Sequence, residues 1–196
     1  MKSSSLLLMV TIAGIIFQSC QSTDKGSEAG DTTVIDHTIV DTVKPGTRAK
    51  LEDEIQTAMF IEKAALGGML EVTLGKLAFQ KAANQGVRAF GKLMEQDHKR
   101  IDNALKVLSS AKGLKLPMAL PAKELEQVRQ MRKMETPYFE KLYMKMMIED
   151  HNKDIELFKG AGNSPDTAVS NFALKFLPVL ETHREKALKV RERIGD

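Results

Sequence analysis

The chain has 196 residues, with 29 basic and 26 acidic side chains, a formal net charge of +3 and one cysteine. The charges alternate in sign and form no basic stripe with interleaved aromatic residues, which excludes a nucleic-acid-binding footprint. One cysteine excludes an intrachain disulfide, so core burial has to stabilise any folded domain.

The N-terminus is typical of an export signal. Lys2 precedes an apolar run over residues 6–17, and the run ends shortly before Cys20. This run has the length of a signal-peptide core and is shorter than the roughly 20 apolar residues of a membrane span. The stretch resembles a bacterial lipobox, with Phe17 at the position usually taken by leucine. We expect removal of residues 1–19 and lipidation of Cys20; the alternative is a plain secretory signal.

The segment after the signal is typical of a flexible tether. Removal of residues 1–19 takes away one lysine and leaves 28 basic against 26 acidic side chains, a net charge of +2. Residues 20–50 are polar and rich in Thr, Asp and Gly, and no role is predicted for His37 within them. The expected location is the bacterial cell envelope, with the lipid anchor in the outer membrane and the protein facing the periplasm.

From residue 51 onward, apolar residues recur every three or four positions, which predicts helices. The predicted helices cover residues 51–83, 86–111, 122–159 and 165–193. Ser164 and Pro165 are predicted as the N-cap and first residue of the last helix. Long helices joined by short loops favour antiparallel neighbours, so residues 51–196 are predicted to form an all-α, up-down-up-down four-helix bundle.

Each predicted helix carries one polar side chain on its inward apolar stripe. These residues are Glu71, His98, His151 and His183. A carboxylate in an apolar core has to be paired, protonated or coordinated, because burying it alone is costly. Neutral imidazole and carboxylate groups suit one divalent ion such as zinc, iron or manganese. The four residues are therefore a candidate metal site.

Two other metal chemistries are less well supported by the residues. Di-iron bundles need two Glu-x-x-His pairs, and only Glu95 and His98 have that spacing. A dinuclear oxidation site is therefore not expected. The methionines around Met146 are potential soft ligands for Cu(I), but methionine more often fills irregular cores.

Helix geometry predicts which of the four polar residues lie level. At 1.5 Å per residue, Glu71 and His98 both lie about 20 Å from the first turn, whereas His151 and His183 lie about 13 and 27 Å from the second hairpin turn. We expect the first three residues to cluster and His183 to lie nearer Tyr143. A kink at a proline in the last helix leaves a four-ligand cage open as the alternative.

Asp97 and Asp150 each precede a histidine in the sequence. Adjacent residues on a helix point about 100° apart, so each aspartate is better placed to orient the histidine of a neighbouring helix than its own neighbour. The alternative is a solvated acid that flanks the core.

Four segments together resemble a known family. They are "GGMLEVTLGKLA" (67–78), "LMEQDHKR" (93–100), "PYFEKLYMKMMIEDH" (137–151) and "LPVLETH" (177–183). Their order resembles the motif set of a bacterial envelope family of unknown function, DUF4142, over about residues 55–192. The resemblance implies a ferritin-like fold, export and no assigned activity. It also implies that the family's motif positions are Glu71, Asp97, His98, Tyr143, His151 and His183. Glu140 departs from the aspartate expected after Phe139.

Two functional hypotheses follow. No hydrolase, phosphate-loop or Cys-x-x-Cys motif is present, and no catalytic residue is predicted. The first hypothesis is a lipid-anchored, ferritin-like bundle that binds one metal ion for storage, buffering or stress protection. The second is a non-catalytic envelope module whose exposed helices bind a protein partner, while the Glu/His network only fixes the fold. The identity of that partner and assembly into a homo-oligomer stay open.

Overall fold

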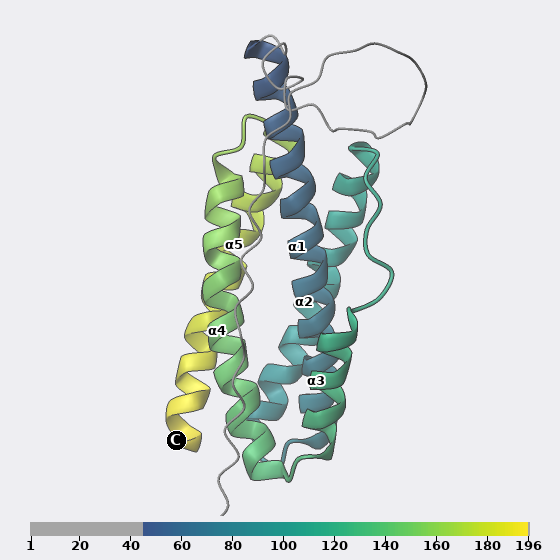
Figure 1. The fold of residues 1–196 in the computed structure, drawn as a ribbon. Helices are drawn as coiled ribbons and strands as arrows, with labels where there is room; N and C mark the ends of the chain where they lie inside the picture. The colour runs from purple at the N-terminus through teal and green to yellow at the C-terminus, as the bar shows by residue number, and fades with distance from the viewer. Residues whose placement is uncertain (1–44, 196) are drawn as a thin grey trace, which may run out of the picture. The chain divides into compact units, whose positions relative to one another are not determined.

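The protein is described by a computed structural model over residues 45–195, and this range is all-helical, with no strand (Figure 1). The helices are α1 (Pro45–Lys81), α2 (Gln85–Ala111), α3 (Ala122–Lys133), α4 (Thr136–Gly162) and α5 (Thr167–Ile194). The predicted all-α class is confirmed. The predicted signal, Cys20, His37 and the tether up to residue 44 lie outside the described residues.

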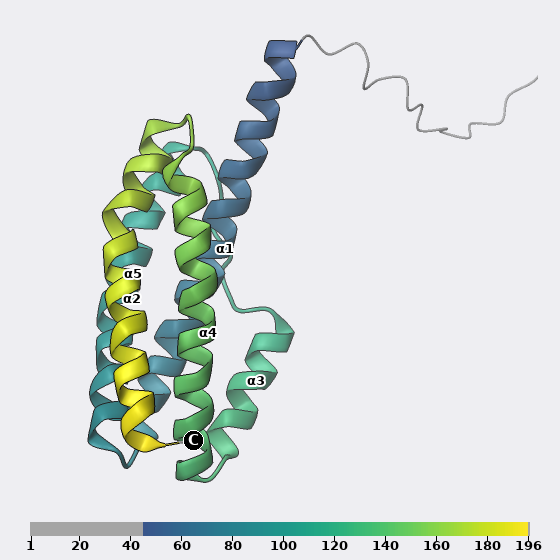
Figure 2. The same cartoon turned by 90° about the vertical axis from the view of Figure 1, so that its left-hand side faces the viewer.

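The four long helices lie side by side (Figures 1 and 2). α1 packs mainly against α2, and α4 packs mainly against α5. Contacts of α2 with α5 and of α1 with α4 join the two pairs, and the short α3 lies against α1. Within residues 45–195, no helix is both long and apolar enough to cross a membrane.

The predicted single helix over residues 122–159 is wrong, because the structure divides it into α3 and α4. Met134 and Glu135 between them have extended backbones, with ψ of 149° and 147°. Pro137 explains the break: its ring would clash with the carbonyl of Lys133 in a continuous helix, and it has no N–H to donate.

At the other end of the domain, α1 begins at Pro45 rather than at residue 51.

The start of α5 also differs from the prediction. Asp166 Oδ1 accepts hydrogen bonds from the backbone N–H groups of Ala168 and Val169, at 3.0 and 3.3 Å. Asp166 is therefore the N-cap instead of Ser164, because a carboxylate accepts both orphan N–H groups and its charge favours a helix N-terminus. α5 then runs without interruption through Pro178.

Two glycines set the spacing between α1 and α2. A Cβ atom on Gly75 would lie 2.7 Å from the carbonyl oxygen of Gly91, and a Cβ on Gly91 would lie 2.6 Å from that of Gly75. No side chain fits between the two backbones at this point. The helices therefore approach each other closely at a fixed place along their axes.

The core consists of two apolar clusters. The methionine-rich cluster contains Met94, Met131, Met144, Met146 and Met147 beside Phe139 and Tyr143. The phenylalanine-rich cluster contains Phe60, Phe158, Phe172 and Phe176 beside aliphatic residues such as Ile101 and Ile155. The methionines thus act as core residues, which is the commoner role of this side chain.

Candidate metal centre

A layer of polar side chains lies between the two apolar clusters. It contains Glu71 from α1, His98 from α2, His151 from α4 and His183 from α5, and all four are at most 2% exposed. Each of them is flanked along its helix by members of the two clusters; His98, for example, stands between Met94 and Ile101. The polar layer therefore crosses the full core and touches all four long helices.

Glu71 contacts two of the histidines. Its Oε2 lies 2.9 Å from His98 Nδ1, and its Oε1 lies 3.1 Å from His151 Nδ1. Side chains tilt toward the N-terminus of their own helix, so Glu71 and His98 lean toward each other across the α1–α2 pair. Neither contact has hydrogen-bond geometry, and both carboxylate oxygens are buried without a hydrogen-bond donor among the described residues.

His183 belongs to the same layer, so its expected separation from His151 is wrong. His183 Nδ1 lies 3.2 Å from His151 Nε2. The reason is at the α4–α5 junction, where the Ser170 hydroxyl donates to the carbonyl of Gly162 at 2.6 Å. The end of α4 is thus level with Ser170. Counted from that contact, His151 and His183 lie about 17 and 20 Å along their helices, which makes them level.

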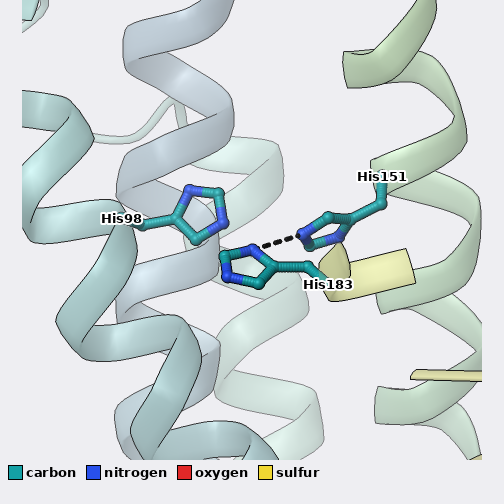
Figure 3. A group of neighbouring side chains, drawn as sticks. All are labelled: His98, His151 and His183. Carbon is teal, nitrogen blue, oxygen red and sulfur yellow. Dashed lines mark hydrogen bonds between the residues drawn. The ribbon is translucent and has the colours of Figure 1, made fainter. Parts of the chain in front are cut away.

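The hydrogen-bond acceptors outside the layer decide which ring nitrogens carry protons. His151 Nδ1 lies 2.8 Å from the carbonyl oxygen of Met147, which can only accept, so this nitrogen is the donor. His183 Nε2 lies 2.9 Å from Asp97 Oδ2 and donates to that carboxylate. A neutral imidazole has one N–H group. The facing nitrogens, His151 Nε2 and His183 Nδ1, are at hydrogen-bond distance (dashed line in Figure 3), but with both outer nitrogens donating they both present lone pairs.

The third histidine completes the arrangement (Figure 3). Because His98 Nδ1 lies against Glu71, its remaining nitrogen is Nε2, which is buried and has no hydrogen-bond partner among the described residues. Figure 3 shows a nitrogen of His98 facing the other two rings. One nitrogen from each ring lies within 4.8 Å of the others. Two nitrogens bound to one zinc ion are about 3.4 Å apart, close to the 3.2 Å between His151 and His183.

Burial controls the protonation of the layer. It lowers the pKa of His98, His151 and His183 from 6.5 to about 4, so these rings are neutral at neutral pH. Burial raises the pKa of Glu71 to about 7, and the attraction of His151 only partly opposes this rise. Neutral imidazoles with free lone pairs are the form that binds metal ions.

The other predicted residues have separate places. Asp97 reaches the histidine of a neighbouring helix, as the sequence suggested, while Asp150 instead accepts from Lys153 at 2.9 Å. Tyr143 stacks on Phe139, with ring centroids 5.9 Å apart, and its hydroxyl is buried without a hydrogen-bond partner among the described residues. The pKa of the Tyr143 hydroxyl is held well above its usual range, mainly by burial and to a smaller extent by the charge of Glu71.

Glu140 has a structural position away from the layer. Its Oε1 accepts a 2.7 Å hydrogen bond from the backbone N–H of Asn84 in the turn between α1 and α2. The Asn84 side chain in turn accepts from the N–H groups of Gly86 and Val87 at the start of α2. Glu140 therefore holds this turn and lies outside the candidate site.

Sequence reasoning missed two carboxylates near Glu71. Asp102 and Asp154 are half-buried, and burial is the main cause that raises the pKa of each. Gly67 and Gly68 on α1 leave the space for them: a Cβ on Gly67 would contact Asp154 at 3.5 Å, and one on Gly68 would overlap Asp102. The sequence signal was the Gly-Gly pair one helical turn before Glu71.

The fold and the site define an all-helical protein with a buried cluster of three histidines and a glutamate. The chain belongs to the family described as "Domain of unknown function (DUF4142)", which matches residues 42–190 and confirms the resemblance seen in the sequence.

One solved structure is similar in fold. It is described as "Crystal structure of DUF305 fragment from Deinococcus radiodurans", with a TM-score of 0.62 and 10% sequence identity. The similarity covers 70% of this chain and 96% of that chain, and at this identity it shows the fold alone. No curated protein matches the chain.

Proposed function

We propose that the protein is a ferritin-like, antiparallel four-helix bundle that binds one divalent metal ion at its three buried histidines, for storage, buffering or stress protection. One observation carries this proposal. His151 Nε2 and His183 Nδ1 face each other at 3.2 Å while both outer nitrogens donate to fixed acceptors. Two facing lone pairs repel each other, and a cation between them converts that repulsion into two bonds.

The residues divide into ligands and orienting groups. The ligand atoms are His98 Nε2, His151 Nε2 and His183 Nδ1. A histidine that binds metal normally donates its other N–H to a carboxylate or carbonyl, and Asp97 and the Met147 carbonyl occupy these places for two of the rings. Glu71, predicted as a ligand, lies against Nδ1 of His98, which has no other partner at that nitrogen among the described residues, and this fits an orienting role for that ring.

The donor set narrows the choice of metal. Three imidazole nitrogens suit zinc and iron(II), whereas manganese(II) prefers oxygen ligands. Three protein ligands also leave a fourth coordination position open, a feature of catalytic and exchangeable sites more than of structural ones. We therefore rank zinc and iron above manganese for this centre.

The second candidate is a non-catalytic envelope module in which the polar layer only fixes the fold. The observation in its favour is that the contacts of Glu71, His151 and His183 link α1, α2, α4 and α5 in one continuous network. A buried polar network can fix the register of helices without any ligand. In that case no metal binds, and the exposed helical faces carry the function by contacting a partner.

Metal analysis separates the two candidates. The purified protein is loaded with zinc, iron(II) or manganese(II), desalted and analysed beside a His98→Ala, His151→Ala double variant. We expect about one equivalent of zinc or iron in the unchanged protein and less than about a tenth in the variant. His37→Ala, which removes the histidine outside the described domain, is the matched control and should bind like the unchanged protein. Absence of bound metal in the unchanged protein would reject the metal-binding function.

Thermal unfolding provides an independent way to distinguish the metal-binding protein from the interaction module. A ligand that binds only the folded state stabilises it by about 2.7 kcal/mol at a hundredfold excess over Kd. The loaded protein should therefore unfold at a lower temperature after addition of a chelator. The interaction-module candidate instead requires identical melting curves with and without chelator.

We further propose that the protein is a lipoprotein of the bacterial envelope, anchored in the outer membrane through Cys20 and facing the periplasm. The support is the signal-like N-terminus with the only cysteine of the chain at the expected cleavage point. Cys20→Ser should move the protein from the membrane fraction to the soluble fraction of the cell. Retention of this variant in the membrane fraction would contradict lipidation.

A further inference from the structure

A cavity of about 210 Å³ lies along the seam between α1 and α4, beside the first turn of α3. Its lining contains four carboxylates and one cationic side chain. The carboxylates are Glu71, Glu124, Asp150 and Asp154, and the cation is Lys153. The cavity is therefore acidic, although the surrounding core is apolar.

The lining becomes more buried toward the polar layer. Pro121 and Lys153 are exposed, Glu124 and Asp154 are half-buried, and Glu71 is only 1% exposed. Glu71 is also the residue whose two oxygens contact His98 and His151. The cavity thus leads from the surface to the side chain that lies against the histidine rings.

Carboxylate oxygens at both ends of this path lack a hydrogen-bond donor among the described residues. Both oxygens of Glu71 and Oε2 of Glu124 are buried without a hydrogen-bond partner among the described residues. Lys153 pairs with Asp150 at 2.9 Å, but its side chain is 74% exposed and its charge is largely in solvent. A cavity lined by four carboxyl groups and one exposed ammonium group, with low-dielectric walls, attracts cations.

Gly67 gives the path its width. It lies in the wall of the cavity, and a Cβ atom on it would stand 3.5 Å from Asp154 Oδ1. A side chain at this position would occupy space directly beside a carboxylate of the path. The glycine therefore leaves the passage open one helical turn before Glu71.

The opposite side of the histidine layer has a different charge. There Asp97 accepts from His183 and is also paired with Arg100, at 3.1 Å. A cation that approached along the α2–α5 side would meet a carboxylate that already has two partners, one of which is a guanidinium group. The electrostatics therefore favour entry along the α1–α4 seam.

The carboxylates of the cavity do not make a second metal site of their own. Among the described residues, the three histidines form the group whose ligand atoms converge within 4.8 Å. Carboxylates that are spread along a path can pass a hydrated cation inward without holding it. Their arrangement therefore fits a role in moving a cation inward better than a role in holding it.

We propose that the α1–α4 cavity is the entry route by which a hydrated divalent cation reaches the three histidines, with Glu124, Asp150 and Asp154 attracting it and Glu71 receiving it at the inner end. This inference rests on the proposed metal-binding function. In this proposal the cavity carboxylates control how fast the ion binds, and they do not coordinate the bound ion.

Loading kinetics test the route. Cobalt(II), whose visible absorption reports binding to nitrogen ligands, is mixed rapidly with the purified protein and with a Glu124→Gln, Asp154→Asn double variant. We expect association to be about tenfold slower in the variant at low ionic strength, with a weaker dependence on salt and the same final stoichiometry. The matched control is Glu149→Gln, Glu156→Gln, which removes two exposed carboxylates of α4 that do not line the cavity. This control should load at the unchanged rate.

A second variant tests the path without changing charge. Gly67→Ala adds one methyl group to the cavity wall at an ordinary contact distance, so the protein should fold and still load, but more slowly than the unchanged chain. Gly160→Ala, with no atom near its added Cβ, is the control. This pair keeps the test decisive if the charge variant does not fold.

Each result has one meaning. Equal association rates for the unchanged protein and both cavity variants would overturn the route, as would equal slowing in the Glu149/Glu156 control. A lower final stoichiometry at an unchanged rate would also overturn it, because the carboxylates would then be ligands. If the unchanged protein binds no cobalt, zinc or iron, the metal-binding function itself fails and the route fails with it.

Discussion

The two apolar clusters on either side of the polar layer are packed in different ways. In the phenylalanine-rich cluster, Phe60 meets Phe158 edge to face at 5.2 Å, and Phe172 meets Phe176 at 5.0 Å. Such ring pairs have preferred geometries and few rotatable bonds. The methionine-rich cluster also has ring pairs at Tyr143, but five of its members are methionines, whose three rotatable bonds let them adapt to irregular gaps. The polar layer therefore has one rigid and one adaptable neighbour.

The largest loss of stability should follow from a substitution in the phenylalanine-rich cluster. Phe158 is 3% exposed and packs against both Phe60 and Phe172. Phe158→Ala should lower the free energy of unfolding by about 3–5 kcal/mol, because the surrounding rings cannot collapse into the cavity. Urea denaturation measures this loss. Phe79→Ala, at a position 42% exposed, is the control and should cost much less; similar losses at both positions would contradict the rigid packing.

An intermediate effect, dependent on pH, is expected from Glu71 in the layer itself. Its pKa rises from 4.5 to about 7 on folding, mainly through burial, so the folded state keeps a proton that the unfolded state has lost. The stability contributed by Glu71 is thus complete below about pH 4.5 and decreases as the pH rises to about 7. Glu71→Gln has no proton to lose, so its stability relative to the unchanged protein should rise over this range by on the order of 3 kcal/mol.

Urea denaturation from pH 4.5 to 7.5, with chelator present, measures the difference between the two proteins. Glu62→Gln, an exposed position on the same helix, provides the control and should follow the unchanged protein at every pH. A constant difference between Glu71→Gln and the unchanged protein across this range would mean that Glu71 does not titrate in the folded state as described.

The smallest loss of stability is expected from a substitution in the methionine-rich cluster. Met147 is fully buried, and it contacts the layer through its backbone carbonyl, which accepts from His151. Met147→Leu conserves volume and leaves that carbonyl in place, so it should cost less than about 1.5 kcal/mol and should not change metal content. Denaturation and metal analysis of one preparation test both statements. A loss as large as that of Phe158→Ala would remove the contrast between the clusters.

Much of this architecture could be predicted from the sequence. The three-to-four-residue periodicity identified the long helices, and the polar residues on apolar stripes identified Glu71 and the three histidines. The break at Pro137 was missed because the apolar pattern continues on both sides of it, although the proline itself was the physical signal.

The relation between His151 and His183 could not be predicted from ideal helix lengths. It depends on the Ser170–Gly162 hydrogen bond, which sets where α5 begins beside α4, and no local pattern encodes that overlap. The protonation of the rings likewise depends on partners distant in sequence, such as Asp97 for His183. These features arise from tertiary contacts, which a periodic pattern does not contain.

The contact between Gly75 and Gly91 has a consequence for the mechanical stiffness of the polar layer. Where helices touch through side chains, changes of side-chain rotamer allow small shifts of one helix axis against the other. Here backbone meets backbone, with each carbonyl oxygen in the place where a Cβ of the other glycine would stand, so neither helix has a rotamer to change at that point. Glu71 lies one helical turn from this junction and His98 lies two turns from it. The separation of α1 and α2 beside Glu71 and His98 is therefore fixed by a backbone contact, which yields less than a contact between side chains.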